Sequence, residues 1–146
     1  MHPYPHLYTV SGSCTAAGLV TLATTGVPPM YSAPPAEFDG PGDQWSPETL
    51  LCAAVADCFV LSFRAVASAS KFSWLALECA VQGTLDRIER VSQFTRFDIR
   101  AKLTAAPGTD PARAKTLLEK AEHVCLISSS LKGEIHLVTE IAVGEV

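Results

Sequence analysis

The stretch SPETLLCAAVADCFVLSFRAVASAS, residues 46–70, decides the fold of this chain. Its start, Ser46–Glu48, is typical of a helix N-terminus, because Ser caps helices, Pro suits the first helical position and a carboxylate favours the first turn. The rest of the stretch lacks Gly and Pro and is charged only at Asp57 and Arg64. A helix that is apolar on nearly every face lies in the centre of a protein. We therefore expect a long central helix, covered by sheet on one side and by a second subunit on the other.

Segments with strand patterns lie on both sides of this helix. Residues 7–13 and 19–25 are rich in Thr, Val and Tyr and predict two short strands. Residues 26–45 form a long loop rich in Pro and Gly, of a length that is often functional. Period-two alternation predicts two further strands at 75–85 and 97–103, each with one wet face. The inward side chains of the first of these are expected to be Leu75, Leu77, Cys79, Val81 and Leu85.

The sequence of the C-terminal third predicts a helix, a break in that helix and a last strand. Asp110 followed by Pro111 starts the helix, which is expected to break near His123–Cys125. A short helix then runs to Gly133, and residues 135–143 alternate as a strand. The predicted fold class is α+β, with antiparallel sheets packed around the long central helix in a single domain, 1–146.

Composition excludes several classes of function. The net charge is -4 and the pI is near 5.5, which disfavours nucleic-acid and anionic membrane surfaces, so neither partner is expected. No apolar run is expected to reach the ~18 residues of a membrane span, and Met1–Val10 shows no secretory signal. Five cysteines, an odd number, indicate a reducing and hence cytoplasmic location. No spacing resembles a metal site, and no cofactor is predicted.

Two cysteines are candidates for redox chemistry. Cys58 lies in the middle of the apolar helix, and Cys125 lies at the predicted break, where the backbone N–H groups of residues 126–128 could stabilise its thiolate. A free cysteine is commonly a small hydrophobe of the core, and periodicity alone favours that alternative for Cys58. The core interpretation is kept for Cys14, Cys52 and Cys79. Asp57, beside Cys58, is interpreted as a solvent or interface contact.

Three motifs resemble those of one family. Residues 46–59 resemble the [SN]-P-E-x-L-x-x-A-x-x-x-C-F helix of the OsmC/Ohr family, and residues 121–131 resemble its second-cysteine segment. Phe38–Gly40 matches a short Phe-acidic-Gly motif in the long loop. The predicted order of elements agrees over essentially the whole chain. Two cysteine motifs in the right elements make this resemblance specific.

The resemblance implies an intertwined homodimer that reduces organic hydroperoxides. Cys58 would be the peroxidatic thiolate that becomes a sulfenic acid. Cys125 would condense with it to a disulfide, which a dithiol reductant reopens. Glu48 matches a family glutamate that holds an arginine against the reactive sulfur. The apolar residues expected to favour an organic peroxide substrate are Leu51, Val55 and Phe59.

One departure from the family leaves the activity open. The family places an arginine in the N-terminal half, but no Arg precedes Arg64 here, and Glu37 stands immediately before Phe38. A lowered thiol pKa needs a cation, a helix N-terminus or a metal. Arg64 lies about 120° around the helix from Cys58, which makes it a poor substitute.

Other cations could take that place: the candidates are Arg87, Arg90, Arg96 and a residue of the partner subunit. If none does, the alternatives are a redox-sensing or binding protein with weak or no peroxidase activity, or a purely structural dimeric module.

Overall fold

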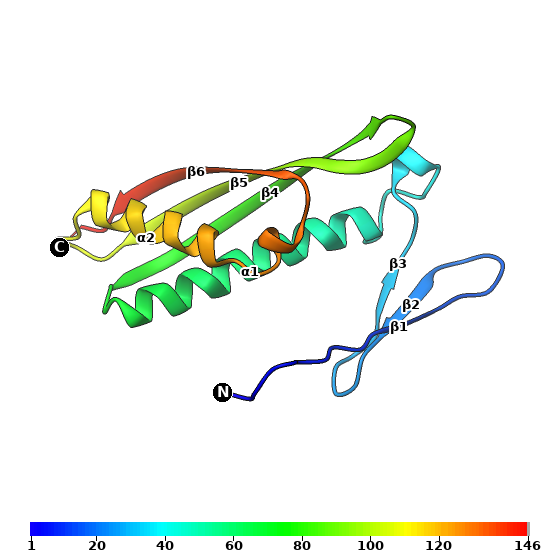
Figure 1. Cartoon of the computed structure of the whole chain (residues 1–146), viewed down its shortest axis with the longest axis horizontal. Coiled ribbons are helices and arrows are strands. Elements are labelled where there is room, and N and C mark those ends of the chain that lie inside the picture. The colour runs from blue at the N-terminus through cyan, green and yellow to red at the C-terminus, as the bar shows by residue number, and fades with distance from the viewer. Residues whose placement is uncertain (146) are drawn as a thin grey trace. The chain divides into compact units, whose positions relative to one another are not determined.

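The computed structural model describes residues 1–145, and the chain divides into two compact units, residues 1–50 and the residues from 51 onward (Figure 1). The boundary falls in the first turn of the long helix, and each unit is described by itself. The expectation of a single domain stays a prediction.

The first unit carries a small antiparallel sheet. It comprises β1 (Ser11–Ser13), β2 (Val20–Ala23) and β3 (Met30–Ser32), in the order β1-β2-β3. The two predicted strands are present but shorter than expected. The prediction of an unbroken loop over 26–45 was wrong, because it contains β3 and the 3-10 helix η1 (Ala36–Phe38). A turn at Gly26, whose φ is 84°, reverses the chain so that β3 pairs with β2.

The long helix α1 spans Pro47–Ala69, as predicted. Its start is closed by Ser46 and Thr49 reciprocally. The Thr49 N–H donates to Ser46 Oγ at 3.2 Å, and the Ser46 N–H donates to Thr49 Oγ1 at 2.9 Å. Thr49 therefore takes the place that Glu or Gln usually has in a capping box. The neighbouring Glu48 carboxylate is not used by the cap.

One face of α1 is buried. Its buried side chains recur at helical spacing, as expected for a stripe that packs against a core: they are Val55, Phe59, Phe63, Val66 and Ala67. On another face, Leu61 is 50% exposed, so the described chain covers α1 on one side only. This helix of 23 residues is also long and apolar enough, by length and composition, to cross a membrane. The expectation that no apolar run reaches that length was therefore wrong.

The second unit contains a mixed sheet with the order β4-β5-β6. The strands are β4 (Trp74–Ile88), β5 (Val91–Ala105) and β6 (Glu134–Val143). β4 and β5 form an antiparallel hairpin, but β5 and β6 pair in parallel, which corrects the expectation of purely antiparallel sheets. The reason is the connection, because helix α2 (Pro111–Val124) carries the chain back to the end at which β5 begins.

The core of this unit lies between the sheet and the two helices, which cover the same face (Figure 1). Asp110 caps α2 as predicted, with Oδ1 accepting from the Ala112 N–H at 3.0 Å. The alternation predicted for residues 97–103 is present in β5, where Phe97, Ile99, Ala101 and Leu103 are buried. Two of the side chains predicted to face inward from β4 do not: Leu75 occupies a bulge and is 63% exposed, and Leu85, beside a second register shift, is 39% exposed. Trp74 instead packs against the core and meets Phe63 edge to face.

Candidate active site

The structure brings Cys58 and Cys125 together. Cys58 lies on α1, Cys125 caps the C-terminal end of α2, and the two thiols lie close enough for each to shift the pKa of the other. Both are free thiols; Cys58 is half-buried and Cys125 is buried. Two cysteines that are 67 positions apart in the sequence thus form one thiol pair, as their motifs implied.

The backbone after Cys125 supplies unpaired donors. Cys125 has φ -65° and ψ 107°, an extended conformation that ends α2. A 3-10 turn, η2 (Ser128–Ser130), begins three residues later. Within residues 1–145, the N–H groups of residues 126–128 have no carbonyl acceptor, so they are free to face an anion.

These donors act mainly on Cys58. Burial by itself raises the pKa of the Cys58 thiol, but hydrogen bonding more than offsets it, so the pKa is lowered. The contributions that lower it are, from the largest, the backbone at Ile127, the Cys125 side chain, the Ser62 hydroxyl and the backbone at Leu126. Ser62 lies one turn further along α1, with its Oγ 3.9 Å from the Cys58 sulfur. Cys58 is therefore the member of the pair that ionises first.

The pKa of Cys125 is shifted in the opposite direction and is raised. Burial raises the pKa of its thiol, the hydroxyl and backbone of Ser128 oppose that rise, and the hydrogen bond and charge of Cys58 add to it. The sequence predicted that residues 126–128 would stabilise a Cys125 thiolate. This was wrong for Leu126 and Ile127, because the extended Cys125 backbone directs their N–H groups to Cys58 instead.

The other cysteines differ from the pair. Burial raises the pKa of Cys52, against a weaker opposing effect of the Gly83 backbone. Burial and the charge of Cys125 raise the pKa of Cys79 to about 11. Both side chains pack against the core, as expected. Cys14 is exposed, which corrects its assignment to the core.

No cation contributes to the lowered pKa of Cys58 in the part of the chain that the structure describes. Arg96 is held by Asp98, with Nη2 2.7 Å from Oδ1. Arg64 is exposed on α1, and Glu37 and Asp57 are exposed as well. Neutral donors, rather than an arginine, therefore stabilise the thiolate in this single chain.

Glu48 lies in the first turn of α1, ten residues and about 15 Å along the helix axis from Cys58. Its Oε2 is buried and has no hydrogen-bond partner among residues 1–145. A buried carboxylate oxygen without a donor is costly. The geometry thus leaves a place for a donor from outside the described chain.

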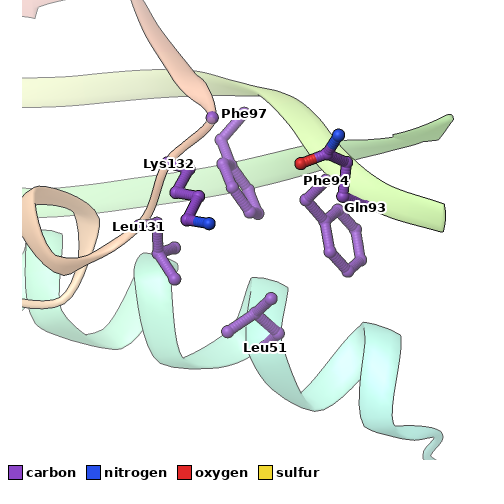
Figure 2. Close-up of a pocket in the computed structure, with 7 residues that line it drawn as sticks. Leu51, Gln93, Phe94, Phe97, Leu131 and Lys132 are labelled. Atoms are coloured by element: carbon purple, nitrogen blue, oxygen red, sulfur yellow. The ribbon is translucent and has the colours of Figure 1, made fainter. Parts of the chain in front are cut away.

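The substrate-binding candidates are placed differently from one another. Leu51 lines a pocket of about 200 Å³ (Figure 2). Val55 and Phe59 have no exposed surface and lie in the core. The pocket is lined by Leu51, Gln93, Phe94, Phe97, Leu131, Lys132 and Gly133.

The Phe38–Gly40 motif forms a tight turn in the first unit. Asp39 has φ 60°, and the Gly40 N–H donates to the Pro35 carbonyl at 2.9 Å. A side chain at Gly40 would collide with the carbonyl oxygen of Pro34. The motif therefore shapes this loop.

Sequence reasoning missed Ser62, the direction of the amides after Cys125, and the position of Lys132 in the lining of the pocket. Ser62 could have been found, because a residue four positions after Cys58 lies beside it on the helix. The other two required the course of the chain between Cys125 and β6.

Comparisons with known proteins agree on one family. The family described as OsmC-like protein matches residues 40–140. The chain is 29% identical over 144 residues to the organic hydroperoxide resistance protein of Xanthomonas axonopodis pv. citri, covering 96% of this chain and 98% of that one. It is 27% identical over 92 residues to peroxiredoxin OsmC of Escherichia coli, covering 63% of this chain and 64% of that one.

Solved structures share the fold. A crystal structure of an organic hydroperoxide resistance protein from Legionella pneumophila superposes with a TM-score of 0.73 and 26% identity. The match covers 94% of this chain and 99% of that one. The α+β fold with two sheets and a long helix is therefore the fold of these proteins.

Proposed function

Because the chain belongs to the family of OsmC-like proteins, we propose that it is a thiol-dependent peroxidase that reduces organic hydroperoxides. One observation carries the proposal: the end of α2 brings Cys125 to Cys58 on α1, and the pKa values of the two thiols are shifted in opposite directions, down for Cys58 and up for Cys125. A nucleophile paired with a resolving thiol is the arrangement that a disulfide-forming peroxidase needs.

The proposed cycle has three steps. The Cys58 thiolate attacks the terminal peroxide oxygen, the O–O bond breaks, and Cys58 becomes a sulfenic acid while the alkoxide leaves and takes a proton as an alcohol. The Cys125 thiol then condenses with the sulfenic acid, forming the disulfide and releasing water. A dithiol reductant reopens the disulfide by two exchange steps and is itself oxidised to a disulfide.

The amides of Leu126 and Ile127 and the Ser62 hydroxyl have the role that a cation has elsewhere. They donate to the sulfur in its charged form, which is how hydrogen bonding lowers a thiol pKa. Fixed backbone donors need no reorganisation when the thiolate forms.

We further propose that the chain acts as an intertwined homodimer. The described residues leave Leu61 of α1 half-exposed and Glu48 Oε2 without a donor. No Lys or Arg precedes Arg64. A second copy would cover the open face of α1 and could bring a donor to Glu48, which is the role proposed for this residue.

The compartment proposed for this cycle is the cytoplasm. Five free cysteines suit a reducing environment, where a dithiol reductant is available.

The direct test is turnover of cumene hydroperoxide by the reduced protein with dithiothreitol as the dithiol. We expect peroxide consumption by the wild type, loss to the background rate in Cys58→Ser, and retention in the matched control Cys14→Ser, because Cys14 is exposed and far from the pair in sequence. Absence of turnover in the intact, reduced wild type would overturn the proposal.

A second function is favoured by the absence of a cation at Cys58 among residues 1–145. Without one, peroxide reduction could be slow, and the pair would act as a redox sensor that records oxidation as a disulfide. The two functions separate in stopped-flow measurements of the reduced protein without dithiothreitol: a peroxidase forms the Cys58–Cys125 disulfide rapidly on mixing with cumene hydroperoxide, whereas a sensor of this kind forms it slowly. A protein silent in both assays would be a structural module.

A further inference from the structure

The pocket beside α1 is built by an irregularity in β5. Phe94 and Phe97 are three positions apart, so a regular strand would place them on opposite faces. The pairing shifts between Thr84 and Leu85 of β4, which leaves Thr95 as an extra residue in β5. This bulge turns both rings toward α1, where they stack with centroids 5.3 Å apart (Figure 2).

Two glycines allow the walls of the pocket to lie close to each other. A side chain at Gly83 would come within 2.8 Å of both the Cys52 sulfur and the Phe94 ring. A side chain at Gly133 would come within 3.2 Å of the Phe97 ring and of the β5 backbone. The close approach of the pocket walls therefore depends on Gly83, where any side chain would collide, and is eased by Gly133, where a methyl group would be tight.

The pocket and the thiol pair share their framework. Leu51 precedes Cys58 by seven residues, so the two lie about 10 Å apart along α1 and within about 20° around it. Leu131 and Lys132 follow Cys125 on the segment that leads to β6. A chain-like ligand in the pocket would thus lie along the face of α1 that carries Cys58.

Lys132 is the only charged residue of the pocket lining. Figure 2 shows its nitrogen directed toward the space between the Phe97 and Leu51 side chains. Its ammonium has no ion-pair partner within residues 1–145. The chain as a whole is acidic, with a net charge of -4. An anion would therefore be attracted to the pocket by the Lys132 ammonium itself and not by the overall charge of the protein.

The size and chemistry of the pocket define its ligand. A space of about 200 Å³ is slightly larger than a cavity of about 150 Å³ that accepts benzene. It therefore takes a short length of alkyl chain or one ring. A free ammonium beside that apolar space complements a carboxylate, with which it forms a charge-assisted hydrogen bond.

We infer that Lys132 is a specificity-determining residue that selects hydroperoxides carrying a carboxylate, the acid lying at Lys132 and the peroxide reaching Cys58. This inference rests on the proposed function and names the substrate class of the same site. It requires a substrate in which several bonds separate the acid from the peroxide, to span the distance along α1.

The kinetic test compares linoleic acid hydroperoxide with its methyl ester, below the concentration at which either forms micelles. We expect the wild type to prefer the acid by about tenfold in kcat/KM, chiefly through KM. In Lys132→Met, which keeps the apolar stem, the acid-to-ester ratio should fall to about one. Lys132→Arg should restore it.

The matched control is Lys120→Met, which removes the same charge from the exposed face of α2. It should keep the wild-type ratio. A wild type that does not prefer the acid, or a Lys132→Met protein that still does, would overturn the inference.

A binding test separates this inference from the proposed function. Decanoate and decanol are titrated calorimetrically into Cys58→Ser, which cannot turn over peroxide. Tighter binding of decanoate that is lost in the Cys58→Ser/Lys132→Met double variant supports the role of Lys132 even if no peroxidase activity is found. Equal affinity for both ligands contradicts that role even if the peroxidase is active.

Discussion

Cys52 and Cys58 lie on the same apolar helix, six residues apart, and differ in chemistry because they face different neighbours. Cys52 faces β4 at Gly83, and burial raises its pKa. Cys58 points about 120° away around the axis. There it meets the amides after Cys125 and the Ser62 hydroxyl, and its pKa is lowered.

The comparison shows that burial alone does not decide whether the pKa of a thiol is raised or lowered. Desolvation is the largest single effect on the pKa of both residues, and it raises both. The difference lies in the number of donors that converge on the sulfur. Cys52 has one backbone donor, whereas four groups act on Cys58.

The largest expected effect is on alkylation of the individual thiols. At pH 7, iodoacetamide should modify Cys58 more than about a hundredfold faster than Cys79, because a thiol with a pKa of about 11 has roughly a hundredth of the thiolate of an ordinary one. Cys52 should also lag behind Cys58. Peptide mass spectrometry of timed samples measures each site, and equal rates at Cys52 and Cys58 would contradict the assigned environments.

Removing the resolving thiol, Cys125, should raise the pKa of Cys58 and so make its reactivity more like that of Cys52. In Cys125→Ala the S–H donor is lost, so the Cys58 pKa should rise and its alkylation rate at pH 7 should fall by about two- to tenfold. Peroxide should convert Cys58 to a sulfenic acid that accumulates, since no thiol is left to condense with it. Dimedone labelling measures that species, and its absence after peroxide treatment would argue against a peroxidatic Cys58.

The crowded environment of Cys52 can be tested by adding a methyl group at Gly83, which faces it. Gly83→Ala places a methyl group 2.8 Å from the Cys52 sulfur and the Phe94 ring, so we expect a loss of about 1–3 kcal/mol in the free energy of unfolding. Cys52→Ala should relieve part of this loss in the double variant, because the two sites share the crowded space. Urea unfolding of the four proteins measures the coupling, and strict additivity would contradict the contact.

The smallest effect is expected at Ser62. The Ser62 hydroxyl lies 3.9 Å from the Cys58 sulfur and lowers the pKa of the Cys58 thiol. Ser62→Ala removes this hydroxyl. Alkylation of Cys58 at pH 7 should slow by about twofold, and the difference should vanish at alkaline pH, where both proteins are ionised. The exposed Ser129→Ala serves as the control. A rate difference that persists at alkaline pH would assign Ser62 a role other than stabilising the thiolate.

Depressed and raised pKa values also act on stability with opposite signs. The folded state favours the Cys58 thiolate, so this residue stabilises the fold above the ordinary thiol pKa and loses that contribution as the pH falls through its lowered value. Cys79 favours the neutral thiol, so its contribution is present below the ordinary value and is lost as the pH rises toward about 11.

The sequence by itself predicted most elements, because their signals are local. Capping residues and periodicity define α1, α2 and the inward face of β5 within a few neighbouring residues. Local patterns failed where pairing decides the outcome. β3 is too short to show periodicity, the bulge moves Leu75 outward, and the direction of β6 depends on the path of α2.

For the site, the sequence determined which two thiols to consider, since their motifs are contiguous. Only the tertiary structure decided which of them ionises, because a thiol pKa depends on donors that arrive from another part of the chain. Leu126 and Ile127 are nearly seventy positions from Cys58, and no periodicity links them. The same holds for Lys132, which shares a pocket with Leu51 only through the chain that follows α2.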